Sequence, residues 1–244
     1  EAEDYDGRPS HKLKVLTVYI VYSVNICHEV DGVNINPYAA KDMTYHHGNL
    51  REALLEAATD LLTTEGPQNL SLRAAARKAG VSQSAPYRHF SAKGDLLSAV
   101  GQRGFLRLRD HLLACLEGQP EHRERLYRSG AGYVEFAEKN PHLFRPMFGP
   151  LMASEDEHEG LHLHCRECFA VLMEVISEGQ AAGVFKSGNT EELAKLTWTM
   201  VHGIAHLAID NQLKSEGYGG RYEMLRMLGH HLVEGLAPRH PSAD

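Results

Sequence analysis

The sequence has little of what disulfide-rich proteins, membrane proteins and enzymes need. Its 244 residues include one tryptophan and four cysteines, Cys27, Cys115, Cys165 and Cys168. So few cysteines do not form a disulfide scaffold, and we expect reduced thiols in a cytoplasmic protein. The strand-favouring stretch at residues 15–26 is shorter and more polar than the ~20 apolar residues of a membrane helix. A glycine-rich phosphate loop and a nucleophile beside a general base are also missing. These absences predict a protein with no enzymatic activity, no cofactor and no membrane partner.

Negative charge dominates the chain but is unevenly spread. The net charge is −7 overall, −3 for residues 1–42, +1 for residues 43–100 and −5 for residues 101–244. Within the middle segment, residues 71–93 carry five basic side chains and no acidic one. An acidic protein with one compact basic stretch has a single place for a polyanion, although a solvated charged face is the commoner meaning of such a run.

Apolar residues recur at helical spacing throughout the chain after Met43. Caps, prolines and glycines separate the helices: Ser71 and Gly80 bound a short one, Pro141 begins another, and Asn189 opens a capping box. The pattern predicts an all-α protein with about nine helices and no strand in this part of the chain. The expected helices lie at residues 50–65, 72–79, 83–89, 93–116, 121–139, 141–148, 155–182, 189–213 and 221–236.

Two of the short helices form one unit with the basic stretch. The helices at 72–79 and 83–89 are separated by a turn in which Gly80 supplies a positive φ. This arrangement is typical of a helix-turn-helix, whose second helix enters the major groove of DNA. Short or hydrogen-bonding side chains at 83–85 suit base edges, and groups at both ends of the unit suit phosphates. The predicted DNA contacts are Ser71, Arg73, Gln83, Ser84, Ala85, Tyr87, Arg88, His89 and Lys93.

Two segments of this region carry a resemblance to a known family. Residues 45–58 read YHHGNLREALLEAA and residues 77–97 read RKAGVSQSAPYRHFSAKGDLL. Over residues 44–100 the chain strongly resembles the DNA-binding domain of the TetR (tetracycline repressor-like) family of bacterial transcription regulators. Pro86 departs from the family, which often has an apolar residue there, and residues 1–42 precede the place where members usually start.

The rest of the chain resembles a subset of that family. Residues 140–149 (NPHLFRPMFG) and 198–203 (WTMVHG) are similar to the C-terminal domain named for its Trp-His-Gly motif. The resemblance implies a homodimeric repressor that binds a palindromic operator and is released by a small molecule. The expected domains are an extension loosely ordered or foreign to the fold (1–42), a DNA-binding domain (43–95), a ligand-binding and dimerisation domain (96–237) and a tail (238–244).

Large apolar residues after position 100 are core candidates, and some should line a cavity for a largely apolar effector. The expected ligand-binding residues are Tyr133, Phe136, Phe148, Met152, Cys168, Phe169, Leu172, Trp198, Val201 and His202. The last two helices carry more apolar residues than one core partner needs, which predicts a dimer interface. These residues are Leu193, Leu196, Met200, Ile204, Leu207, Leu225, Leu228, Leu232 and Leu236.

Two alternatives stay open beside this interpretation. His158, His162 and Cys165 share a helical face and Cys168 lies one turn further, so a metal- or thiol-redox-sensing regulator is the first. We favour core cysteines with surface histidines. A DNA-organising protein without sequence preference is the second alternative. His202 lies four residues before His206 without the glutamate of a zinc protease, and we expect a buried, hydrogen-bonded His202 beside Trp198.

Overall fold

A computed structural model of the chain describes residues 50–149, 158–214 and 220–236. These residues form eight α-helices and two 3-10 helices and contain no strand, so the predicted all-α class is confirmed. The predicted N-terminal extension and tail lie outside the described residues. The elements are α2 (Leu50–Glu65), α3 (Leu72–Lys78), η2 (Ala85–Arg88), α4 (Lys93–Leu116), α5 (His122–Lys139), α6 (Pro141–Met147), α7 (Glu159–Ala181), α8 (Thr190–Ile209), η4 (Gln212–Lys214) and α9 (Gly220–Leu236).

Local chemistry explains where most of these helices begin and end. The Ser71 side chain accepts the N–H of Ala74 at 3.1 Å and so caps α3. Asp95 accepts the backbone N–H groups of Ser91 and Ala92, which fixes the start of α4 at the predicted residue. Asn189 accepts the N–H of Glu192 and caps α8. A helix start leaves several N–H groups without an intrahelical partner, and these side chains satisfy part of that set.

Three predicted helices differ from the structure by more than one residue. Helix α7 begins at Glu159 rather than at residue 155, and the other two differences have a local cause. The second helix of the helix-turn-helix is the 3-10 helix η2 rather than an α-helix over 83–89. Pro86 has no N–H to bond back to Ser82, and the Ser82 carbonyl instead accepts from Ala85 at 3.0 Å, an i to i+3 bond. Helix α8 ends at Ile209 instead of residue 213 because Asn211 adopts a φ of +57°.

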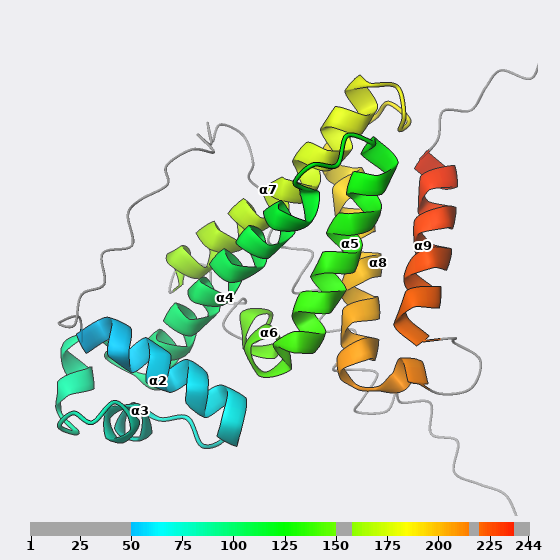
Figure 1. Cartoon of the computed structure of the whole chain (residues 1–244). Coiled ribbons are helices and arrows are strands. Elements are labelled where there is room, and N and C mark those ends of the chain that lie inside the picture. The colour runs from blue at the N-terminus through cyan, green and yellow to red at the C-terminus, as the bar shows by residue number, and fades with distance from the viewer. Residues whose placement is uncertain (1–49, 150–157, 215–219, 237–244) are drawn as a thin grey trace, which may run out of the picture.

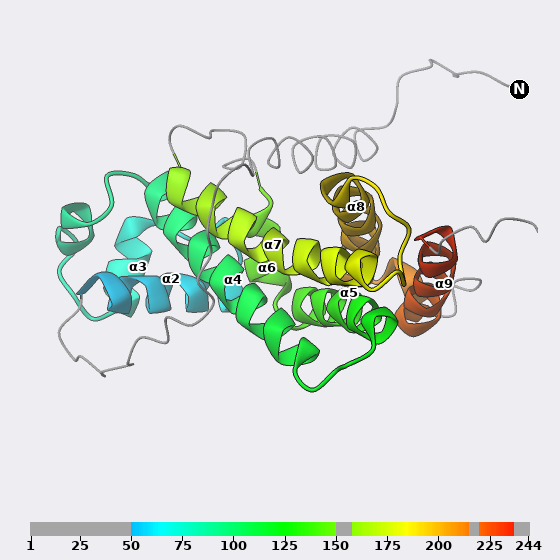
Figure 2. The same ribbon diagram turned by 90° about the horizontal axis from the view of Figure 1, so that it is seen from above.

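The helices form two groups joined by α4 (Figure 1). Helices α2, α3 and η2 gather at one end of the molecule, where α2 packs on the first turns of α4 and on α6. Helix α4 then continues into a bundle, lying against α7, α5 and α6, while α8 and α9 form the opposite side (Figure 2). No helix in the three described ranges has the length and apolar character needed to span a bilayer.

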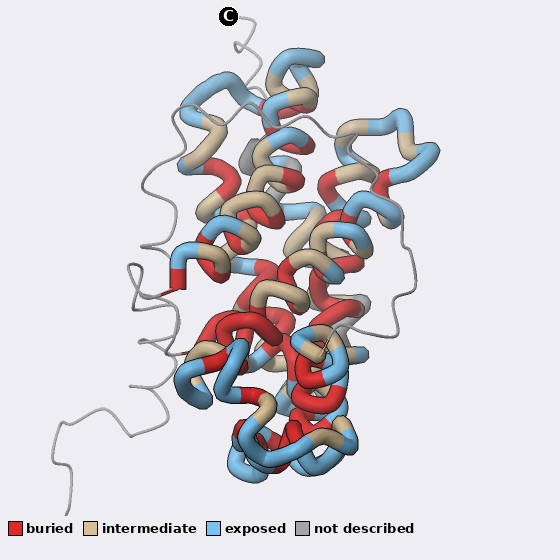
Figure 3. Tube along the Cα trace, turned by 90° about the vertical axis from the view of Figure 1, so that its left-hand side faces the viewer, coloured by how far each residue is buried: buried red, intermediate tan, exposed pale blue. Residues whose placement is uncertain are grey.

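The buried residues lie on the sides of the helices that face the interior of the molecule (Figure 3). Its largest fully buried side chains include Phe105, Leu108, Phe144 and Met147, which bring α4 and α6 together. Because Phe105 and Leu108 belong to the same helix that begins at Lys93, a single rigid element runs from the helix-turn-helix into the centre of the bundle.

Candidate DNA-binding surface and ligand cavity

The turn of the helix-turn-helix is built by the backbone of Gly80. The N–H of Gly80 bonds to the carbonyl of Arg77 at 3.2 Å, and the N–H of Val81 bonds to the carbonyl of Ala76 at 3.0 Å. These two bonds form a Schellman motif, which requires a left-handed residue after the helix. Gly80 meets this requirement with a φ of +70°. The motif turns the chain sharply and sets the direction of η2.

The residues of η2 and the two positions after it are either buried in the core or exposed to solvent, apart from the half-buried Ala85. Pro86 and Phe90 are buried and hold the element against the core. Tyr87, between them, is 53% exposed, although an aromatic side chain gains free energy from burial. Eight of the nine predicted DNA contacts are exposed and Ala85 is half-buried. The structure thus brings the predicted residues together on one solvent-facing surface of α3, η2 and the start of α4.

Two of these residues also have a role within the fold. Ser71 is the cap of α3, so its hydroxyl oxygen is engaged with Ala74. The Lys93 ammonium group donates to the carbonyl oxygen of Pro67 at 3.0 Å, across the loop between α2 and α3. Lys93 remains exposed at the N-terminus of α4, where its positive charge and the helix dipole favour the same anion.

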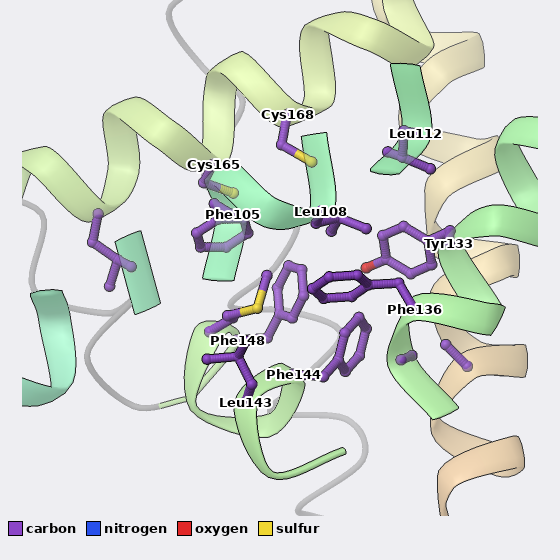
Figure 4. Packing of buried hydrophobic residues seen from close by; sticks show 14 of the residues in the cluster. Phe105, Leu108, Leu112, Tyr133, Phe136, Leu143, Phe144, Phe148, Cys165 and Cys168 are labelled. Carbon is purple, nitrogen blue, oxygen red and sulfur yellow. The ribbon is translucent and has the colours of Figure 1, made fainter. Parts of the chain in front are cut away.

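A cavity lies inside the bundle between α4, α5, α7 and α8. Its unfilled space measures about 700 Å³, including its opening to solvent. Seven of the ten predicted ligand-binding residues line it: Tyr133, Phe148, Cys168, Phe169, Leu172, Trp198 and Val201. Residues outside the ten predicted ones complete the wall, namely Phe105, Leu108, Leu112, Ser129, Gly130, Cys165, Arg166, Val171 and Thr197. Figure 4 shows the aromatic side chains of Phe105, Tyr133 and Phe148 beside Cys165 and Cys168.

The three other predicted ligand-binding residues lie elsewhere. Phe136 is buried on α5, and its ring lies 6.0 Å from that of His111 rather than in the cavity wall. His202 is buried behind the wall, where it hydrogen-bonds to Tyr133 and packs against the rings of Phe148 and Trp198. Met152 lies outside the described residues.

A chain of hydrogen bonds runs from the cavity wall into the core. The Trp198 indole N–H donates to the Tyr133 hydroxyl oxygen at 3.2 Å, and that hydroxyl lies 2.7 Å from Nδ1 of His202. Nε2 of His202 lies 3.1 Å from Nε2 of His206. The expected buried, hydrogen-bonded His202 beside Trp198 is confirmed, with ring centroids 5.0 Å apart. We refer to Trp198, Tyr133, His202 and His206 as the polar relay.

Burial keeps the polar relay uncharged. Desolvation, aided by the neighbouring His206, lowers the pKa of His202 to about 3. Desolvation and Arg145 lower the pKa of His206, and desolvation raises the pKa of Tyr133 well above its ordinary value. The indole can only donate, so the Tyr133 proton points to Nδ1 of His202, which then donates from Nε2 to His206. The donors of Trp198, Tyr133 and His202 thereby each meet an acceptor.

The residues of the alternative metal or redox site are core residues. Cys165 and Cys168 are buried and form no disulfide, and burial raises the pKa of Cys168 to about 12. A thiol with so high a pKa is a poor metal ligand and reacts slowly with oxidants. The expectation that His158 and His162 lie on the surface is wrong: both are buried, because this end of α7 packs against α4.

One group of side chains in the described ranges brings three metal-ligand atoms within 4.8 Å of one another. It consists of His230, His231 and Glu234 on α9, all exposed. Nε2 of His230 already lies 3.2 Å from Oε1 of Glu234. The group lies on a different helix from Cys165 and Cys168, so it gives no support to a thiolate metal site.

An exposed, acid-free helix-turn-helix carried by an all-α body with an internal apolar cavity defines a DNA-binding transcriptional regulator. Comparison with known families agrees. The family model described as "Bacterial regulatory proteins, tetR family" matches residues 54–100, and that described as "Tetracyclin repressor-like, C-terminal domain" matches residues 126–228. The chain belongs to the TetR family of bacterial transcriptional regulators.

Individual similar proteins share about a third or less of their residues with this chain. The chain is 27% identical over 146 residues to a nucleoid occlusion factor, SlmA, of Marinobacter nauticus, covering 60% of this chain and 74% of that protein. It spans 56% of the Vibrio campbellii protein of the same name. A solved protein of unknown function from Rhodococcus sp. RHA1 is 31% identical, with a TM-score of 0.68 and coverage of 81% of this chain and 100% of that one. A tetR family regulator from Shewanella sp. PV-4, at 18% identity and a TM-score of 0.59, covers 78% and 98% and shares the fold.

Proposed function

We propose that the protein is a ligand-responsive repressor that binds a palindromic operator as a homodimer and leaves it when a small molecule binds. The observation that carries this proposal is that α4 belongs to both sites. Helix α4 begins at Lys93 beside η2, and its residues Phe105, Leu108 and Leu112 line the cavity. A ligand that shifts α4 therefore moves the DNA-binding surface as well.

Contacts between the helix-turn-helix and the bundle support this coupling. Arg103 of α4 forms an ion pair with Glu52 of α2, and Lys93 bonds across to the α2–α3 loop. Helix α2 also packs on α6, which ends beside the cavity-lining residue Phe148. The ligand acts by population shift: it must bind the displaced arrangement more tightly than the one that fits DNA.

Dimerisation is proposed to use α8 and α9. Leu196 and Met200 are 56% and 40% exposed, and with Gly203 and Leu207 they share one side of α8. We refer to these four residues as the α8 stripe. Leu193 and Ile204, which the sequence grouped with this stripe, instead pack inside the chain. Two recognition elements placed ~34 Å apart can read successive major grooves, whereas one reads only a few base pairs.

Selection from a random duplex DNA pool, followed by binding assays on the selected site, tests the proposal. We expect a palindromic consensus. Lys93→Ala should weaken binding to every sequence and reduce the salt slope by about one ion, because it removes a phosphate contact. Gln83→Ala should cost about 1–3 kcal/mol on the selected site and little on random DNA.

Lys186→Ala is the matched control, since this exposed lysine lies in the loop between α7 and α8, at the opposite end of the molecule from α3 (Figure 1). It should leave both affinity and salt slope unchanged. Equal losses for Gln83→Ala on selected and random DNA would argue against base recognition. The absence of any consensus would favour a DNA-organising role, for which the name of the nucleoid occlusion relatives is the specific support.

A further inference from the structure

A second cavity lies between α5, α8 and α9. Its unfilled space measures about 460 Å³, including its opening to solvent, and Leu126, Leu225 and Leu228 supply much of its wall. Helices α5 and α8 lie between this space and the cavity described above, with α4 and α7 on one side and α9 on the other (Figure 1). We refer to the cavity that contains Trp198 in its wall as the main cavity and to the second one as the α9 cavity.

Three residues belong to the walls of both cavities. They are Gly130 of α5 and, one turn apart on α8, Thr197 and Val201. A residue that borders two spaces is the layer that separates them, so at this point the two cavities lie only one residue apart. We refer to Gly130, Thr197 and Val201 as the neck.

Gly130 keeps the neck thin, because it adds no side chain between α5 and α8. Among the described residues, a Cβ at this position would meet one atom within 4 Å, namely Cγ2 of Val201 at 3.6 Å. That distance is an ordinary van der Waals contact, so the neck has room for a methyl group. A larger side chain at position 130 would extend into the space between the two cavities.

The chemistry of the neck suits a hydrocarbon chain. The Thr197 hydroxyl donates to the carbonyl of Leu193, and the adjacent Ser129 hydroxyl donates to the carbonyl of Leu126, each at 2.8 Å. These hydroxyl protons already have acceptors, so an apolar ligand beside them leaves no donor unsatisfied. A hydrocarbon chain that extends from the main cavity past Gly130 would bury its surface against apolar side chains on both sides of α5 and α8.

We propose that the effector is an elongated molecule whose hydrocarbon chain runs from the main cavity past Gly130 into the α9 cavity. Gly130 is then the residue that determines the longest chain the protein accepts. This inference rests on the proposed function only in assigning the main cavity to the effector.

Trp198 allows a direct test, because it is the only tryptophan of the chain and lines the main cavity. Its emission is titrated with 1-hexanol, 1-octanol, 1-decanol and 1-dodecanol, which are uncharged and differ only in chain length. Each added methylene that is buried should tighten binding about fourfold. We expect the affinity of the unaltered protein to rise through 1-dodecanol. Gly130→Leu should bind 1-hexanol within about twofold of the unaltered protein but 1-dodecanol at least about tenfold more weakly.

Two further variants make the result specific to the neck. Gly130→Ala is the matched control and should keep the full dependence on chain length, because its methyl group fits beside Val201. Leu228→Phe fills part of the α9 cavity from another helix and should shorten the accepted chain as Gly130→Leu does, so a folding defect in one variant does not decide the outcome. The inference fails if Gly130→Leu and Leu228→Phe both keep the chain-length dependence of the unaltered protein. It also fails if affinity stops rising at 1-hexanol in the unaltered protein, or if no alcohol changes Trp198 emission.

Operator binding, followed in the same samples by anisotropy, separates this inference from the proposed function. If 1-dodecanol binds with the expected dependence on residue 130 but leaves the operator complex intact, the chain-length assignment stands and the release mechanism fails. If short and long alcohols release the operator equally well from the unaltered protein and from Gly130→Leu, the repressor function stands and the chain-length assignment fails.

Discussion

At the scale of single residues, the sequence predicted only part of the polar relay. The spacing of Trp198 and His202 predicted their contact because both lie on one helix face. Tyr133 was expected only to line a cavity, yet it is the centre of the relay. It lies 65 residues from Trp198 and 69 from His202 in the sequence. Such a pair is brought together by the packing of α5 on α8, which no local pattern encodes.

Removing the central hydroxyl tests the relay. Tyr133→Phe should lower the free energy of unfolding by about 1–3 kcal/mol, because it leaves the Trp198 N–H and Nδ1 of His202 buried without a partner. Urea unfolding measures this loss. Tyr127→Phe on the same helix, at a side chain that is 37% exposed, should change stability by less than about 0.5 kcal/mol. Equal losses in the two variants would mean that the hydroxyl of Tyr133 is energetically unimportant.

The lowered pKa of His202 gives the protein a defined pH dependence. The unfolded chain binds a proton at this histidine near pH 6.5, whereas the folded protein does so only near pH 3. The neutral histidine therefore contributes its full stability above pH 6.5, and this contribution falls as the pH drops toward 3. The slope is at most about 1.4 kcal/mol per pH unit for one such group.

Urea unfolding from pH 7.5 to 4.5, compared between the unaltered protein and His202→Asn, isolates that slope from the background of titrating carboxylates. The variant should lose stability less steeply toward acid than the unaltered protein. Parallel curves would show that His202 takes up its proton at the same pH in both states.

At the scale of elements, the sequence predicted the helix ends that a capping side chain or Gly80 fixes, but not the end of α8, which the positive φ of Asn211 sets. The predicted bounds of α4 agree with the structure at both ends, and those of α3 agree within one residue. The prediction failed at η2 because Pro86 has no N–H at the point where an α-helical bond to the Ser82 carbonyl is needed. The wall residues Arg166 and Ser129 were missed because their neighbours in space come from other helices.

The Schellman turn at Gly80 offers a test at this scale. A Cβ at Gly80 would meet no atom within 4 Å, so substitution acts through the backbone alone. Gly80→Ala should lower stability by about 1–2 kcal/mol, the cost of a positive φ for an L-residue. Gly80→Asn should cost less, since asparagine tolerates this conformation. Thermal unfolding of the two variants checks the order, and a more stable Gly80→Ala protein would contradict the strained turn.

At the scale of the whole molecule, charge and apolar surface are placed at opposite ends. The segment with five basic and no acidic residues is exposed to solvent on α3, η2 and the start of α4, while α8, the helix that carries the α8 stripe, lies on the far side of α4 and α5 (Figures 1 and 2). The acidic body repels DNA except at the helix-turn-helix, so it orients the approach of the protein. A dimer formed through α8 and α9 would leave both helix-turn-helix units exposed.

The α8 stripe allows the dimer to be tested without touching either site. Among the described residues, a Cβ at Gly203 would meet no atom within 4 Å, so no described side chain fills the space over this part of the stripe. Met200→Glu should give a monomer in light scattering at micromolar concentration, because it places two like charges in an apolar interface. Leu113→Glu changes a side chain of similar exposure on α4, 43% exposed against 40% for Met200, and should leave the dimer intact.

Because one helix-turn-helix reads only half a palindrome, the Met200→Glu monomer should also lose most of its preference for the selected site while keeping weak, salt-sensitive binding to random DNA. A monomeric variant that still prefers the palindrome would show that each subunit recognises DNA independently.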